Sequence, residues 1–330
     1  MPSKLDQLRE ISTVVADTGD LNAIKQFRPR DCTTNPSLIL KAAQQEESAE
    51  LVRDVVLASR AAGDSIERTL DKLAVRFGTE LARLVPGHVS TEVNAQLSFD
   101  VEGMVQKAQS LIALYDQQGI GRDRILIKLA ATWEGIQAAR QLEQQGIHCN
   151  LTLVFSMEQA VACGEAGVFL ISPFVGRITD WYKKAEGRDS YPVEDDPGVQ
   201  SVKRIYAHFK QQGFQTVIMG ASFRSAAQVE ALAGCDRLTV SAALLGELDK
   251  DQGVLTRQLS PEAFHSAEHT PPVSQATFLW ALIVNQMAGE KLHEGLRQFH
   301  VDYLKLRDLV EQLDAGERDV QGAAAKADQA

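Results

Sequence analysis

The chain has 330 residues, of which 44% are hydrophobic, enough for one large α/β barrel or two ordinary domains with a full core. Its net charge is −10 with acidic and basic residues interspersed, so neither nucleic acid nor a membrane surface is expected as its main partner. No apolar run approaches the ~20 residues of a membrane span and the N-terminus lacks a signal-peptide core, which predicts a cytoplasmic protein.

Eight short segments are predicted as buried strands because each is apolar or β-branched and ends in small or polar residues. They comprise residues 14–18, 31–34, 88–93, 125–129, 149–154, 169–172, 216–219 and 238–241. Helical patterns with apolar residues at spacings of three and four lie between them. This alternation predicts a (β/α)8 barrel, with a doubly wound open sheet as the alternative.

Local signals agree with these boundaries. Ser156 followed by Gln159 resembles a capping box at a helix start. The triplet Gln-Gln-Gly occurs three times shortly before a strand, ending at Gly119, Gly146 and Gly213, where a glycine suits the end of a helix. We therefore expect helices to begin and end at these positions.

The region after the eighth strand predicts two further helices over residues 274–314, packed on the barrel. Their apolar stripe consists of Phe299, Tyr303, Leu306, Val310 and Leu313. Residues 1–314 are predicted as a single barrel domain with extra N- and C-terminal helices. Residues 315–330 are nearly devoid of large apolar side chains and are predicted as a disordered tail.

Metal and disulfide sites are not expected. The four cysteines form no CxxC pair and are predicted as buried, reduced thiols. His265 and His269 stand four residues apart, but no third ligand is apparent, so a surface segment is favoured over a zinc site. No GxGxxG or GxxxxGK[ST] motif is present, which argues against nucleotide binding.

Lys128 is the most informative single residue, because it interrupts a run of Ile and Leu that otherwise forms a fully buried strand. Desolvation penalises a charged ammonium, so the pKa of this lysine is expected to fall below the usual value of about 10.4. A neutral buried amine is a nucleophile toward carbonyl groups and forms a Schiff base. The ordinary alternative is a lysine that reaches solvent or pairs with a carboxylate.

Polar residues end seven of the eight predicted strands, and in a barrel these ends meet at one rim, where active sites are built. They are Asp17, Thr33, Asn35, Glu92, Lys128, Asn150, Thr152, Ser172, Arg177, Ser222 and Arg224. Each has an ordinary explanation alone, such as a turn residue at Asp17, a helix cap at Asn35 or an ion-pair partner at Glu92. Their convergence on one rim weakens those explanations.

Together these groups suit carbon–carbon bond cleavage through an imine. An iminium withdraws electrons, a carboxylate accepts the hydroxyl proton of the sugar, and a second carboxylate with a hydroxyl can hold the water of imine formation. Amides and hydroxyls fix sugar hydroxyls, and arginines suit a terminal phosphate through bidentate hydrogen bonds.

At these residues the chain closely resembles the classical bacterial and eukaryotic transaldolases, over residues 4–313. The most specific segments are 14–20, 33–38, 125–130, 150–153, 171–177 and 219–224. The resemblance implies a metal-free class I aldolase barrel without a cofactor, usually a homodimer. It implies transfer of a dihydroxyacetone unit from sedoheptulose 7-phosphate to glyceraldehyde 3-phosphate in the pentose phosphate pathway, giving erythrose 4-phosphate and fructose 6-phosphate.

The resemblance also implies a role for each residue at the rim. Lys128 is the Schiff-base lysine, and Asp17 is the acid and base for the cleaved C4 hydroxyl. Glu92 and Thr152 position the catalytic water. The substrate-binding set comprises Thr33, Asn35, Asn150, Ser172, Phe174, Arg177, Ser222 and Arg224, with the two arginines binding phosphate.

The chain departs from the family pattern at Asn94, Gln96, Ala131 and Ser241-Ala242, so a charge pair near Glu92 is expected to be missing. The nearest rival function is an aldolase that releases free dihydroxyacetone, as in the related, shorter fructose-6-phosphate aldolases. Phe174 favours transfer, because those relatives tend to have a tyrosine there. A barrel that binds sugar phosphate without turnover is a further alternative, opposed by the presence of both Lys128 and Asp17.

Overall fold

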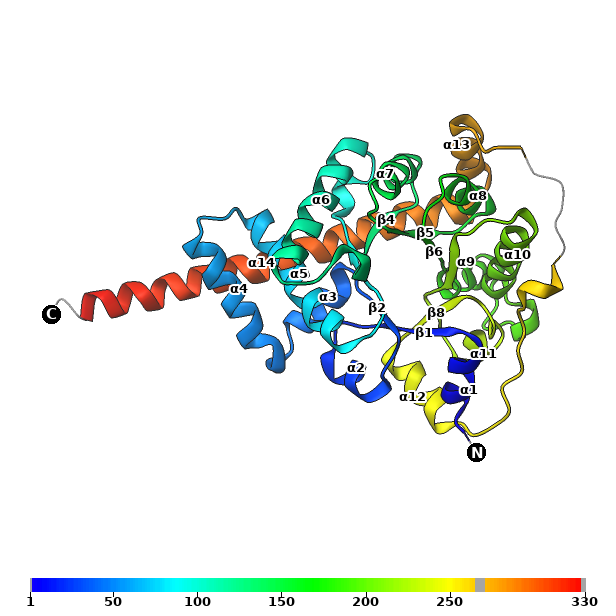
Figure 1. Cartoon of the computed structure of the whole chain (residues 1–330), viewed down its shortest axis with the longest axis horizontal. Coiled ribbons are helices and arrows are strands. Elements are labelled where there is room, and N and C mark those ends of the chain that lie inside the picture. The colour runs from blue at the N-terminus through cyan, green and yellow to red at the C-terminus, as the bar shows by residue number, and fades with distance from the viewer. Residues whose placement is uncertain (1, 265–270, 328–330) are drawn as a thin grey trace.

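Eight parallel strands close into a barrel in chain order, with helices around it (Figure 1). They are β1 (Thr13–Asp17), β2 (Asp31–Thr33), β3 (Val89–Glu92), β4 (Ile125–Ala130), β5 (Cys149–Val154), β6 (Leu170–Pro173), β7 (Val217–Gly220) and β8 (Arg237–Val240). The computed structural model of the chain describes residues 2–264 and 271–327, with side chains to residue 316. The closed barrel confirms the predicted architecture and excludes the open sheet.

The helices alternate with the strands, and further helices precede β1 and follow β8. They are α1 (Lys4–Ile11), α2 (Leu21–Phe27), α3 (Pro36–Ala43), α4 (Ala49–Ala61), α5 (Ile66–Leu84), α6 (Val101–Gln117), α7 (Trp133–Gln144), α8 (Met157–Glu165), α9 (Gly176–Glu186), α10 (Pro197–Gln212), α11 (Ala226–Glu230), α12 (Ala242–Lys250), α13 (Gln275–Val284) and α14 (Gln286–Ala327). Short 3-10 turns are η1 (Glu46–Ser48), η2 (Ala95–Leu97), η3 (Arg122–Arg124), η4 (Val193–Asp195) and η5 (Pro261–Ala263).

The predicted helix boundaries are confirmed. Ser156 Oγ accepts from Gln159 N at 3.2 Å, and Gln159 Oε1 accepts from Ser156 N at 3.2 Å, which completes the capping box of α8. Gly119, Gly146 and Gly213 all have φ between 71° and 75°, a left-handed conformation that glycine adopts without steric cost. These glycines therefore end helices as the repeated triplet predicted.

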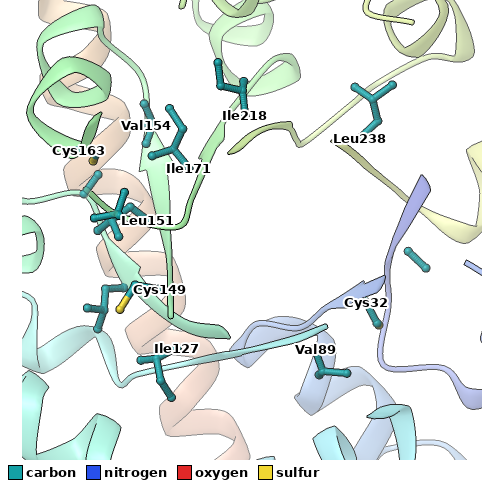
Figure 2. Packing of buried hydrophobic residues seen from close by; sticks show 14 of the residues in the cluster. Cys32, Val89, Ile127, Cys149, Leu151, Val154, Cys163, Ile171, Ile218 and Leu238 are labelled. Carbon is teal, nitrogen blue, oxygen red and sulfur yellow. The ribbon is translucent and has the colours of Figure 1, made fainter. Parts of the chain in front are cut away.

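Alternate residues of each strand face either the barrel interior or the helices. Outward side chains such as Ile127 and Leu238 pack away from the barrel axis in the main core, as Figure 2 shows. A separate interior cluster is formed by Val15, Leu126, Leu170 and Met219, with Phe169 and Val217 packed against it. Because strands have a period of two, the next inward positions belong to Asp17, Lys128 and Ser172, which lie directly above this apolar layer.

Helix α14 crosses close to the barrel at Gly295, where a Cβ atom would lie 2.6 Å from Leu153 Cδ2. Leu153 is itself unusual, with φ 59° at the bulge where the register between β5 and β6 shifts. The close approach lets Phe299 pack with Phe174 in a buried cluster. The predicted packing of this helix on the barrel is confirmed, and Phe299 packs at the mouth of the barrel, beside the predicted site.

The rest of the stripe lies elsewhere. Leu306 and Val310 are buried against α3, α4 and α5, whereas Leu313 is exposed. The backbone of α14 continues in helical form to Ala327, through residues that the sequence predicts as a disordered tail (Figure 1). The division into one domain over residues 1–314 and a tail beyond stays a prediction.

Two further observations bear on the sequence predictions. All four cysteines are free and buried, as expected. Within the described parts of the chain, no helix combines the length and apolarity needed to span a bilayer. His265 and His269 lie outside the described residues.

Candidate active site

Lys128 lies on β4 inside the barrel and only 5% of its surface is exposed. Its Nζ atom is 3.1 Å from Glu92 Oε2 and donates to the carbonyl oxygen of Thr34 at 3.1 Å. The register pairs Glu92 on β3 directly with Lys128, so the ion pair follows from the sheet itself. The amine thus faces a carboxylate, a carbonyl and the Phe299 ring, whose centroid is 5.9 Å away, rather than Ile and Leu alone.

Asp17 ends β1 and is held by a hydroxyl. Thr33 Oγ1 donates to Asp17 Oδ1 at 2.9 Å, and the register places Thr33 beside Asp17 on the neighbouring strand β2. Burial raises the pKa of the Asp17 carboxyl, although Lys128 and the Thr33 hydrogen bond both oppose this rise. The result is a partly buried carboxylate near Lys128 that is more basic than an exposed one.

Glu92 and Thr152 contribute the remaining groups around the amine. Burial raises the pKa of Glu92, and the positive charge of Lys128 works in the opposite direction. Thr152 is fully buried, and its Oγ1 atom has no hydrogen-bond partner among the described protein groups. Because buried polar atoms rarely lack a partner without reason, this hydroxyl is available to water or substrate.

Asn150 and Ser172 form a buried pair one strand further on. Ser172 Oγ donates to Asn150 Oδ1 at 2.6 Å, and Asn150 Nδ2 donates to Ser90 Oγ at 3.1 Å. Both ends of the Asn150 amide are thus already bonded within the protein. Asn150 does not line the cavity, whereas Ser172 does.

Two arginines also line the cavity. Arg177 Cζ lies over the rings of Phe174 and Phe299, at 5.0 and 5.7 Å from their centroids. Burial and the nearby charge of Arg224 lower the pKa of Arg177. A largely buried guanidinium stacked on phenyl rings and facing a second guanidinium is suited to an anion that neutralises both.

Arg224 is oriented by its neighbours. Its Nε and Nη2 atoms contact Asp180 Oδ2 at 2.9 and 2.8 Å, and Nη1 donates to Ser222 Oγ at 3.3 Å. Ser222 has φ 61°, a left-handed conformation that a residue with a side chain seldom adopts. A Cβ on Gly176 would lie 2.6 Å from Arg224 Cγ, so glycine there allows the arginine stem to pass close to α9.

A cavity of about 250 Å³ brings most of these side chains together. Ten of the twelve residues predicted for the site line it, namely Asp17, Thr33, Asn35, Lys128, Thr152, Ser172, Phe174, Arg177, Ser222 and Arg224. Glu92 adjoins it through Lys128, and Asn150 lies behind Ser172. The cavity therefore brings the amine and a carboxylate together with two guanidinium groups.

The structure adds residues to this site that the sequence reasoning missed. The cavity is also lined by Met219, Ala221, Phe223, Thr239 and Ser241. Thr239 stands at an inward position of β8, and strand periodicity alone could have indicated it. Phe299 could not be found in that way, because it lies on a helix far along the chain and reaches the site only through tertiary packing.

The residues that depart from the family pattern have ordinary positions in the structure. Asn94 Oδ1 accepts from Gln96 N at 3.1 Å, so these two neutral residues form a local turn after Glu92, where a charge pair was expected to be missing. Ala131 is fully buried, and Ser241 lines the cavity just before α12. Within the described residues, no group of three or more His, Cys, Asp or Glu side chains could hold a metal ion.

A closed parallel barrel with a buried lysine beside two carboxylates at the strand ends has the architecture of a class I aldolase. The family described as Transaldolase/Fructose-6-phosphate aldolase matches residues 14–310. The chain is 55% identical to a transaldolase of Rhizobium etli over 315 residues, which covers 94% of this chain and 98% of the relative.

Two further transaldolases match the chain over nearly the same length. A transaldolase of Marinomonas sp. is 55% identical over 312 residues, covering 93% of this chain and 98% of its own length. One of Vibrio campbellii is 53% identical over 314 residues, covering 94% and 99%. The chain therefore belongs to the transaldolase family, and its enzyme class is that of a transferase.

Proposed function

We propose that the chain transfers a dihydroxyacetone unit from sedoheptulose 7-phosphate to glyceraldehyde 3-phosphate, releasing erythrose 4-phosphate and forming fructose 6-phosphate, a step of the non-oxidative pentose phosphate pathway. The observation that carries this proposal is the cavity that Lys128 and Asp17 share with Arg177 and Arg224. A ketose phosphate offers a carbonyl to the amine and a phosphate to the arginines, which matches this set of groups.

The reaction begins when the Lys128 ammonium gives a proton to Glu92 and the resulting amine adds to the ketone. The proton then passes from Glu92 to the departing hydroxyl, so that water leaves and an iminium forms. Glu92, 3.1 Å from the amine, and the unpartnered Thr152 hydroxyl are placed to hold that water and relay its protons. The iminium supplies the electron sink, so the proposed chemistry needs no metal or other cofactor.

Asp17 then accepts the proton of the C4 hydroxyl while the C3–C4 bond breaks and its electron pair moves into the iminium. The products of this step are a free aldehyde phosphate and a neutral enamine on Lys128. The enamine carbon attacks the acceptor aldehyde, and the new alkoxide takes its proton back from Asp17. Water finally hydrolyses the imine and frees Lys128.

The dihydroxyacetone hydroxyls are assigned to Asn35, Thr33 and Ser172, which line the cavity near Lys128. Asn35 Oδ1 caps α3 by accepting from Leu38 N at 2.9 Å, which leaves its amide nitrogen for the substrate. Asn150 supports the same part of the site from behind, because it accepts the Ser172 hydroxyl proton.

Transfer and simple aldol release are separated by one assay. With both substrates, we expect erythrose 4-phosphate and fructose 6-phosphate. With fructose 6-phosphate alone, little free dihydroxyacetone should appear, because the Phe174 ring offers no proton to the enamine. Phe174→Tyr is the matched variant, and it should gain dihydroxyacetone release and lose part of its transfer rate. Equally fast release and transfer in the wild type would favour the aldolase.

Arg177 and Arg224 are expected to bind the substrate phosphate. Replacing either by alanine should raise KM for phosphorylated substrates roughly tenfold to a hundredfold, since one charge-assisted contact is lost. KM for unphosphorylated dihydroxyacetone donors should change much less. Arg188→Ala is a matched control, because Arg188 also stacks on a ring, Tyr191, at 5.3 Å but does not line the cavity. Equal effects on both donor classes would show a structural role instead.

We also propose that the chain forms a homodimer through α13. Four apolar side chains on one face of this helix, Leu279, Trp280, Ile283 and Val284, are exposed, with Trp280 at 67%. Sedimentation of the wild type should therefore give a dimer, and Trp280→Glu should give a monomer. Val254→Glu, at another exposed apolar position, should remain dimeric. A monomeric wild type would refute the proposal.

A cytoplasmic location is proposed on two grounds. The four buried cysteines are free, which fits a reducing compartment. The proposed substrates are sugar phosphates, which are soluble metabolites.

A further inference from the structure

Asp17, Thr33 and Thr239 form a chain of three hydrogen-bonded side chains. This chain lies where the first and last strands of the barrel pair with each other. Thr33 Oγ1 lies 2.9 Å from Asp17 Oδ1, and Thr239 Oγ1 lies 2.7 Å from Thr33 Oγ1. The three residues come from the adjacent strands β2, β1 and β8. Thr33 and Thr239 are 3% and 4% exposed, so little water competes for these bonds.

The direction of both bonds follows from counting protons. An ionised carboxylate can only accept hydrogen bonds, so Thr33 must give its single hydroxyl proton to Asp17. The contact between Thr33 and Thr239 then has only one proton left to use, that of Thr239. Thr239 therefore donates to Thr33 whenever Asp17 is ionised. Because the Thr239 oxygen is then not an acceptor for Thr33, the Thr33 hydroxyl proton stays on the bond to Asp17.

We propose that Thr239 is a positioning residue for the reaction, acting through Thr33 to hold the Asp17 carboxylate in its ionised, proton-accepting form. It touches no reacting atom in this role. The inference rests on the proposed function of Asp17 as the base of carbon–carbon cleavage. It extends the site to β8, for which no sequence motif predicted a functional residue.

The energetic argument concerns how readily Asp17 stays ionised. Burial raises the pKa of Asp17, and the Thr33 hydrogen bond is one of the interactions that lower it again. A hydroxyl that accepts a hydrogen bond becomes a better donor, because bonds in a chain polarise one another at low dielectric. Removing the Thr239 hydroxyl should therefore weaken the bond to Asp17 and raise the pKa of Asp17 further.

Thr239→Val tests the proposal, because valine keeps the shape and removes the hydroxyl. We expect kcat to fall about fivefold with KM nearly unchanged, as for loss of one buried hydrogen bond acting at a distance. The acidic limb of the kcat profile should move to higher pH. Borohydride trapping with fructose 6-phosphate should show more of the adduct carrying the whole donor, since cleavage is slowed and imine formation is not.

Two further variants separate positioning from packing. Thr239→Ser keeps the hydroxyl and should recover most of the wild-type kcat and pH profile. Thr216→Val removes another buried threonine hydroxyl, which donates to the Val168 carbonyl oxygen at 2.7 Å outside the cavity, and should leave both unchanged. Thermal unfolding of all three variants checks that each is folded under the assay conditions.

Three results would overturn the inference. They are a Thr239→Val enzyme with the wild-type kcat and acidic limb, a Thr239→Ser enzyme as slow as Thr239→Val, and a Thr216→Val enzyme with the same defect. Failure of the proposed function is a separate result, because it would appear in the wild type as the absence of any adduct on Lys128.

Discussion

Replacing Lys128 by methionine is expected to abolish covalent capture of the substrate and to lower kcat by on the order of a thousandfold or more, since the covalent route is lost. Borohydride reduction of the wild type with fructose 6-phosphate should add one reduced dihydroxyacetone unit to the peptide that contains Lys128. Methionine preserves most of the buried stem, so the barrel should remain folded.

The control for this experiment is Lys210→Ala. Lys210 is also largely buried and paired, with Nζ 2.8 Å from Asp236 Oδ1, but it does not line the cavity. This variant should retain both the adduct and the activity. An adduct on a lysine other than Lys128, or none in the wild type, would refute the Schiff-base assignment.

Asp17→Asn should form the imine but fail to break the carbon–carbon bond. Asparagine keeps the oxygen that accepts from Thr33, so the local geometry survives while the base is lost. General acid–base catalysis contributes about 10²–10⁴-fold, and kcat should fall by that amount. Mass spectrometry of the trapped protein should then show an adduct with the mass of the whole donor sugar. Normal turnover by this variant would remove Asp17 from the mechanism.

The same residue sets the acidic side of the pH dependence. Asp17 acts as a base only when ionised, and burial raises its pKa. The cleavage rate of the wild type should therefore be lost as the pH falls through this raised pKa, at a higher pH than for an exposed aspartate. Single-turnover cleavage followed from neutral to acidic pH measures this limb directly.

Much of the barrel could be predicted because each strand is recognisable from a short stretch of sequence. A buried parallel strand is a short apolar run, and all eight runs, such as Ile125–Ala130, occur in the structure within one residue of their predicted bounds. The glycine at each helix end needs only a left-handed backbone, which is also a local property. The packing of helix α14 was harder to predict. Its apolar stripe has the period of a helix, but that period gives no information on which surface each residue contacts.

The sequence by itself determined which side chains reach the rim of the barrel, because strand periodicity places Asp17, Lys128 and Ser172 above an apolar layer at the strand ends. Only the tertiary structure decided which groups meet there. Strand register sets Glu92 against Lys128, and barrel closure brings Thr239 to Thr33 across 206 positions of sequence. The crossing of α14 at Gly295 adds Phe299. Such contacts depend on register and close packing between distant segments, which no local pattern encodes.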